Sequence, residues 1–108
     1  MALYLYQVAY TAESIAAQLK NPQDRVAMVA KMLESSVGAK VIGGGYSSGK
    51  FDIAILIEAA DDTTMAACSL AIAAGGALRA SQTTPLLSGE QWVSALKTAA
   101  TINYKPAS

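Results

Sequence analysis

The chain has 108 residues, a size that one hydrophobic core can serve, and its 53% of hydrophobic residues against 15% of charged ones exclude an intrinsically disordered protein. Eight basic residues balance eight acidic ones, so the surplus of positive charge that nucleic-acid or anionic-membrane binding requires is missing. There is no histidine and only one cysteine, Cys68, which excludes an internal disulfide and a cysteine-based zinc site.

The first half of the chain carries the signals of alternating strands and helices. Thr11 is placed to cap a short helix, and Asn21 followed by Pro22 fits the cap and the first position of another. Apolar residues then recur at helical spacing up to Val37, after which Gly38 is the expected left-handed stop. We therefore predict a strand over residues 3–10, helices over residues 12–19 and 22–37, and a glycine-rich strand over residues 40–48.

The second half continues this alternation. Residues 47–50 read as a hairpin turn, Asp61 or Asp62 is placed to cap a helix, and Ser88 and Gln91 have the spacing of a capping box. The predicted elements are a strand over residues 51–59, a helix over 63–74, a strand over 77–87 and a last helix that starts at residue 88. We expect a single domain over residues 1–100 and a C-terminal tail over residues 101–108.

The order of these elements predicts an α+β protein with a ferredoxin-like βαββαβ fold and an extra C-terminal helix. In that topology the first and third strands lie at the centre of the sheet, and the helices pack on one face. Both central strands carry apolar or aromatic side chains on both faces, whereas a solvated face would be polar. We therefore expect another copy of the chain to cover the second face, in a homodimer or higher homo-oligomer; the alternative is that the last helix folds over it.

Signals for export, membrane insertion and cofactor binding are missing from the sequence. Residues 44–50 fit the front of a phosphate-binding loop, but Phe51 stands where Ser or Thr would hold magnesium. A strand is also predicted where that loop requires a helix, so we interpret the stretch as a kinked edge strand and a turn. We expect a cytoplasmic protein with no cofactor, no metal, no nucleic-acid partner and no membrane partner.

The residues Gly49, Phe51 and Asp52 fit a Gly-x-Tyr-Asp motif with Phe in place of the usual Tyr. On this motif the chain resembles the GYD-domain family of small bacterial proteins. The Phe keeps the aromatic ring and removes the phenol hydroxyl, so any role of that hydroxyl does not carry over. The resemblance implies a ferredoxin-like fold of the dimeric α/β-barrel kind, and it implies no particular activity. It covers nearly the whole chain and is also carried by residues 1–7, 20–25 and 78–87.

Asp52 and Arg79 are the charged candidates for a functional site. Asp52 can serve as a base or a hydrogen-bond acceptor, or it can bind backbone N–H groups of the turn and fix the register of the hairpin. Arg79 is the only arginine on a predicted strand; it can bind an anionic ligand, or it can form a salt bridge at the sheet edge or between subunits. Arg25, in a predicted first helical turn, is expected to make a surface or capping contact.

Tyrosines form the aromatic part of the candidate site. Tyr4, Tyr6 and Tyr10 share one face of the first predicted strand, and Tyr46 comes from the neighbouring hairpin. Phenols on a buried face can line a ligand pocket or form an oligomer interface, and we favour the interface. Cys68 is expected to be a small core residue, because no histidine is present to activate it.

Three hypotheses about function follow. The first is a homo-oligomeric domain that binds a small organic ligand between the sheet and a partner subunit, with Tyr6, Tyr46, Asp52 and Arg79 lining the site. The second is a cofactor-independent monooxygenase or isomerase, with Asp52 as the base and Tyr6 or Tyr46 orienting the substrate. The third is a structural subunit of a larger homo-oligomeric assembly. The sequence identifies neither the ligand nor a reaction.

Overall fold

A computed structural model describes residues 1–107 of the chain. The predicted strands and helices are all present, with bounds that differ by a few residues at most. They are β1 (Ala2–Tyr10), α1 (Ala12–Lys20), α2 (Arg25–Val37), β2 (Lys40–Tyr46), β3 (Ile53–Ala59), α3 (Asp62–Ala74), β4 (Leu78–Leu86) and α4 (Gly89–Ala99).

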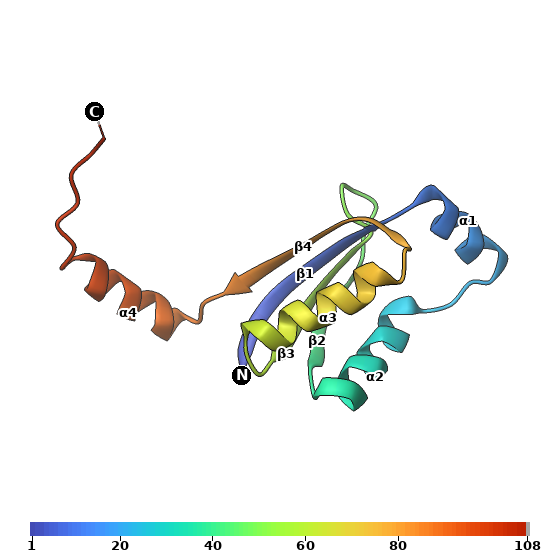
Figure 1. The fold of residues 1–108 in the computed structure, drawn as a ribbon, viewed down its shortest axis with the longest axis horizontal. Helices are drawn as coiled ribbons and strands as arrows, with labels where there is room; N and C mark the ends of the chain where they lie inside the picture. The colour runs from blue at the N-terminus through green and yellow to red at the C-terminus, as the bar shows by residue number, and fades with distance from the viewer. Residues whose placement is uncertain (108) are drawn as a thin grey trace.

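The four strands form one antiparallel sheet in the order β2-β3-β1-β4, so β1 and β3 lie at its centre as predicted. The register places Tyr6 of β1 opposite Ile55 of β3 on one side and Thr83 of β4 on the other. The helices α2 and α3 cover one face of this sheet, and α4 extends beyond its end (Figure 1). The architecture is the predicted ferredoxin-like α+β fold with an extra C-terminal helix.

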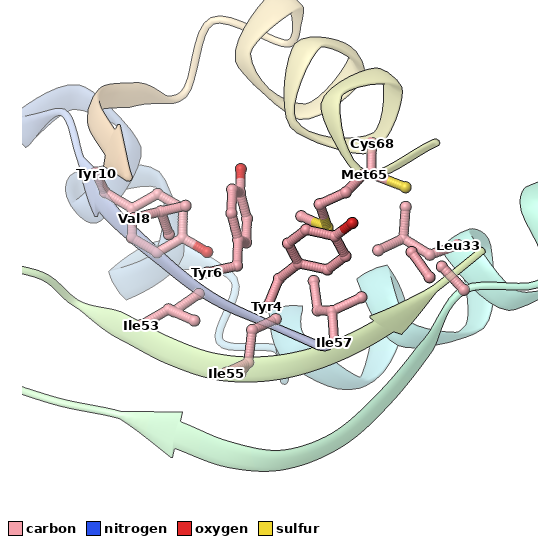
Figure 2. Close-up of a cluster of buried hydrophobic side chains, with 12 residues drawn as sticks. Tyr4, Tyr6, Val8, Tyr10, Leu33, Ile53, Ile55, Ile57, Met65 and Cys68 are labelled. Carbon is pink, nitrogen blue, oxygen red and sulfur yellow. The ribbon is translucent and has the colours of Figure 1, made fainter. Parts of the chain in front are cut away.

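The hydrophobic core lies between the sheet and the helices α2 and α3. Strand alternation sends one set of side chains to this face, and Leu33, Met65 and Cys68 meet them from the helices (Figure 2). Tyr4 and Tyr6 are each 1% exposed in the single chain. Our preferred interpretation of these tyrosines as an oligomer interface is therefore wrong for Tyr4 and Tyr6, because the chain's own helices cover their face of the sheet. The buried residues that β1 and β3 contribute are Tyr4, Tyr6, Val8, Tyr10, Ile53, Ile55, Ile57 and Ala59.

The helix α2 begins at Arg25 and not at the predicted Pro22. Its N-cap is Asp24, whose Oδ1 accepts the backbone N–H of Ala27 at 3.1 Å. The same oxygen accepts the hydroxyl of Tyr46 at 2.6 Å, so an unforeseen contact from β2 holds the cap in place. This shift matters for function, because it places Arg25 at the first position of α2.

The other helix ends follow the sequence signals. Thr11 and Asp61 accept backbone N–H groups as N-caps, and Ser88 forms the predicted capping box with Gln91. Gly38 ends α2 in the left-handed conformation with φ of 70°. These caps are local interactions, and local sequence was sufficient to predict them.

The glycine-rich stretch forms the edge strand β2, as our interpretation of residues 44–50 required. Gly44 has a φ of +101°, and a Cβ atom built there would lie 2.2 Å from the carbonyl oxygen of Ala54 on β3. Only glycine fits this close approach of two backbones. The register of β2 against β3 shifts nearby, between Val41 and Gly43, so the edge strand is irregular.

The last helix, α4, stands apart from the sheet (Figure 1). None of its residues is buried, and Trp92, Val93 and Leu96 are about half exposed, at 59%, 49% and 53%. The radius of gyration is 17.2 Å. A compact domain of this length would have about 13 Å. The alternative in which α4 folds over the second face of its own sheet is therefore wrong for the single chain. Within residues 1–107, no helix has both the length and the hydropathy needed to cross a membrane.

Candidate functional site

A cavity of about 200 Å³ lies between the helix-covered face of the sheet and the helices α2 and α3. Its walls are mostly apolar side chains of β1, β3, α2 and α3, and the segment from Gly75 to Leu78 closes one side. Three polar side chains line it: Tyr6, Tyr10 and Arg25. The shape and lining are those of a small-molecule site, where a few polar groups orient a ligand within an apolar wall.

Tyr6 is the most unusual residue of this cavity. Its side chain is 1% exposed, and its hydroxyl is the one buried side-chain polar atom without a hydrogen-bond partner among residues 1–107. Figure 2 shows the ring rising from β1 with the hydroxyl pointing away from the sheet, toward the layer of helices. Burial raises the pKa of Tyr6 to about 12, so the phenol is neutral and can both donate and accept a hydrogen bond.

Tyr4 is a buried tyrosine of the same strand whose hydroxyl, unlike that of Tyr6, has a hydrogen-bond partner. It lies two residues away on the same face, and its hydroxyl donates to Oδ1 of Asp62 at 2.5 Å. That hydrogen bond is the main reason that the pKa of Tyr4 rises to about 12, and burial adds to it. Tyr4 thus finds a partner in this core, whereas the hydroxyl of Tyr6, a residue that lines the cavity, has none among residues 1–107.

Arg25 and Tyr10 form the more exposed part of the cavity lining. Arg25 is half-buried; it makes a long contact of 4.0 Å to Sδ of Met28, and its guanidinium is also a hydrogen-bond partner of the Tyr10 side chain. Burial raises the pKa of Tyr10, and the positive charge of Arg25 opposes that rise, so the two side chains lie close together. The nearest candidate counter-ion in sequence, Asp24, is engaged as the cap of α2.

Tyr46, predicted to line the site, lies outside this cavity. Its hydroxyl donates to Asp24 Oδ1 and accepts the backbone N–H of Val26 at 2.9 Å, so both functions of the hydroxyl are used at the start of α2. The hydrogen bond from Tyr46 and that from the Ala27 amide hold the pKa of Asp24 below its usual value. Tyr46 therefore positions α2, and with it the cavity residue Arg25, without lining the cavity.

Asp52 and Arg79 also lie away from the cavity lining. Oδ2 of Asp52 accepts the backbone N–H of Tyr10 at 2.8 Å, and the Asp52 amide donates to the carbonyl of Val8 at 2.8 Å. Arg79 is exposed on β4 and donates to the carbonyl of Lys50 at 3.4 Å. Asp52 therefore binds a backbone N–H group of β1 and not one of the hairpin turn, and Arg79 binds a carbonyl of the turn and forms no salt bridge within the described residues.

The structure thus brings only Tyr6, of the four predicted site residues, into the cavity, and it adds Tyr10 and Arg25. Tyr10 shares the face of Tyr6, and this parity was visible in the sequence. Arg25 carried no such signal, because its place in the lining depends on how α2 packs above the sheet. Cys68 is buried in the core, and burial raises the pKa of its thiol, which disfavours the nucleophilic thiolate.

The arrangement is suited to binding. Its polar groups are two phenols and a guanidinium, and the lining includes neither a carboxylate nor the Cys68 thiol. Within residues 1–107, no three potential ligands from His, Cys, Asp and Glu gather closely enough to hold a metal ion.

Comparison with known proteins identifies the family of this sequence. The family model of the GYD domain matches residues 4–96, which is most of the chain and includes every residue that lines the cavity. Among curated proteins, none matches the chain.

Proposed function

The chain belongs to the GYD domain family, and we propose that it is a self-associating domain that binds a small organic molecule in the cavity beneath α2 and α3. The buried, unpaired hydroxyl of Tyr6 carries this proposal. A buried hydroxyl without a partner lowers the stability of the fold by about 1–3 kcal/mol, and a purely apolar side chain at this position would avoid that loss. A ligand with a polar atom at this point would remove the cost.

The proposed pocket differs in place from the one that the sequence suggested. It lies between the sheet and the chain's own helices, where Tyr6 is, and not between the sheet and a partner subunit. Water alone is a poor occupant of this space, because a buried water needs two or more polar partners and the wall around Tyr6 is mostly apolar.

Self-association rests on a separate observation, namely the two apolar surfaces that the single chain leaves uncovered. Leu3, Leu5 and Leu56 lie on the sheet face that carries no helix, and Leu5 pairs with Leu56 across the two central strands. The exposed apolar side of α4 projects from the same molecule. A second copy of the chain supplies matching surfaces under two-fold symmetry, so a homodimer is the simplest way to cover both.

An enzymatic function receives less support from the geometry. The monooxygenase or isomerase hypothesis needs Asp52 as a base beside the substrate, but its carboxylate is engaged by the Tyr10 amide and lies outside the cavity lining. We therefore propose binding without turnover as the function.

Native mass spectrometry of the protein, purified gently from its own host, tests the proposal, because it reports the subunit number and any retained molecule together. Val29 lines the cavity, and Val29→Phe fills part of it; Lys31→Phe adds a similar ring on the exposed side of the same helix, outside the lining. We expect the wild type to carry a defined added mass, Val29→Phe to lose it and Lys31→Phe to keep it. All three should have the same subunit number.

Two results would count against the proposal. A wild-type protein without added mass, which also takes up none from a small-molecule extract of its host, contradicts the binding function. A monomer at every concentration contradicts self-association and leaves the binding function standing.

A further inference from the structure

We propose that the ligand of this cavity is a compact, ring-bearing carboxylic acid with a second polar atom at the end opposite the carboxylate. The inference rests on the proposed binding function and adds the chemical class of the ligand. Three features of the cavity carry it: its volume, the lone cation in its wall and the buried hydroxyl of Tyr6.

The volume and the walls set the size and polarity of the ligand body. The cavity holds about 200 Å³. An engineered apolar cavity of about 150 Å³ accepts benzene, so this one has room for a single ring with small substituents. Val29, Ile55 and Ile72 contribute apolar side chains from α2, β3 and α3, which favours a hydrophobic ring over a sugar or another densely hydroxylated body.

Arg25 sets the charge of the ligand. Its guanidinium is half-buried in the cavity wall and has no carboxylate partner within ion-pair distance in the described part of the chain. A partly buried cation gains from a counter-ion, and the planar guanidinium pairs best with a planar carboxylate through two parallel hydrogen bonds. A phosphate carries more charge than one cation in a mostly apolar cavity can compensate, so a carboxylate is the better match.

Tyr6 is the reason to expect a second polar atom in the ligand, opposite the carboxylate. Its side chain lines the same cavity as Arg25, and its hydroxyl is fully buried, whereas Arg25 is partly exposed. We infer that a ligand whose carboxylate pairs with Arg25 extends with its opposite end toward Tyr6. A hydroxyl or keto oxygen there would satisfy Tyr6, which is neutral and able to donate. Tyr10, beside Arg25, adds a second phenol near the carboxylate.

Isothermal titration calorimetry with three related probes tests each part of this assignment on the full-length protein. The probes are 4-hydroxybenzoate, 4-hydroxybenzamide, which lacks the charge, and benzoate, which lacks the second polar atom. We expect 4-hydroxybenzoate to bind tightest, and each of the other two to bind roughly tenfold more weakly or worse.

Two variants and one control assign these effects to residues. Arg25→Gln should weaken binding of 4-hydroxybenzoate about tenfold and leave 4-hydroxybenzamide almost unaffected, because only the acid uses the cation. Tyr6→Phe should weaken 4-hydroxybenzoate and leave benzoate unaffected. Lys31→Gln removes an exposed positive charge from the same helix outside the cavity lining, and it should change none of the three affinities.

The possible results separate this inference from the proposed function. Equal affinity for the acid and the amide, or a loss with Lys31→Gln equal to that with Arg25→Gln, overturns the carboxylate assignment. If a molecule retained in native mass spectrometry is displaced by none of the three probes, the ligand class is wrong while the binding function holds. If no probe binds and no molecule is retained, the inference fails together with the proposed function on which it rests.

Discussion

At the scale of single residues, Tyr4 and Tyr6 show how far side-chain chemistry can diverge within one strand. They share a face of β1, a burial of 99% and a pKa raised to about 12. Their hydroxyls differ, because Tyr4 finds Asp62 and Tyr6 finds no partner. Sequence parity predicted that both lie on the same face, but the partner of Tyr4 comes from a helix 58 positions away.

This difference predicts opposite effects of the same conservative substitution. Tyr6→Phe should raise the free energy of unfolding of the ligand-free protein by about 1 kcal/mol, because it removes a buried hydroxyl without a partner. Tyr4→Phe should lower it, because the hydrogen bond to the Asp62 carboxylate is lost. Urea unfolding of both variants beside the wild type measures the two changes. A loss of stability in Tyr6→Phe would mean that the hydroxyl is paired in solution, with water for example, and would remove the main support for a ligand.

The raised pKa of Tyr6 also predicts a dependence of stability on pH. In the unfolded chain a tyrosine loses its proton near pH 10, whereas folding holds Tyr6 protonated up to about pH 12. Ionisation of Tyr6 therefore leaves the free energy of unfolding unchanged below about pH 10 and lowers it as the pH rises further, because only the unfolded chain gains from ionisation. Thermal melts from pH 8 to pH 11 should show a steeper fall for the wild type than for Tyr6→Phe. Parallel curves would contradict the assignment.

At the scale of elements, the sequence predicted those features that depend on near neighbours. Thr11, Asp61, Ser88 and Gly38 act at helix ends through groups a few residues away; the predictions for Thr11, Ser88 and Gly38 are confirmed, and of the two predicted alternatives Asp61 and Asp62 the cap is Asp61. The predicted start of α2 at Pro22 was wrong, because Asp24 caps the helix through the Ala27 amide and the Tyr46 hydroxyl of β2 adds a contact to this cap that no local pattern contains. Arg25 was not predicted as a cavity residue, because the cavity forms only when α2 packs against the sheet.

The kink in β2 makes Gly44 the most sensitive glycine of the sheet. In Gly44→Ala the new methyl group would lie 2.2 Å from the Ala54 carbonyl oxygen, at a φ of +101° that alanine disfavours. The variant should lose about 2 kcal/mol or more of stability. Gly45→Ala is the matched control, because a Cβ there meets no atom within 4 Å, and its stability should stay the same or rise slightly. Urea unfolding of Gly44→Ala and Gly45→Ala measures this difference. Equal stability of the two variants would show that β2 accommodates the methyl group without losing stability.

At the scale of the whole molecule, the fold was predictable and the cavity was not. The order of strands and helices follows from the periodicity of hydrophobic residues and from helix caps, and both can be recognised in the sequence. The cavity joins β1, β3, α2, α3 and the segment from Gly75 to Leu78, so its volume depends on how far apart two helices stand above the sheet. A hydrophobic pattern indicates that such side chains are buried, but it does not indicate whether they fill the space between them.

The position of α4 gives a direct test of self-association. Trp92 is the only tryptophan of the chain and is 59% exposed in the single molecule, on the apolar side that also carries Val93 and Leu96. If a second copy covers this side, Trp92 leaves water, so its fluorescence should shift to shorter wavelength as the protein concentration rises. Leu96→Glu places a charge on the same side and should hold the emission at the long wavelength of an exposed tryptophan over the whole concentration range.

Light scattering on the same samples links the optical signal to mass. We expect the blue shift of Trp92 and the doubling of mass to occur over the same concentrations, and Leu96→Glu to suppress both. A dimer that forms while the emission of Trp92 stays constant would show that the chains meet through the open sheet face alone. In that case α4 would remain an uncovered amphipathic helix within the dimer, and its apolar side would have to serve a contact outside the pair.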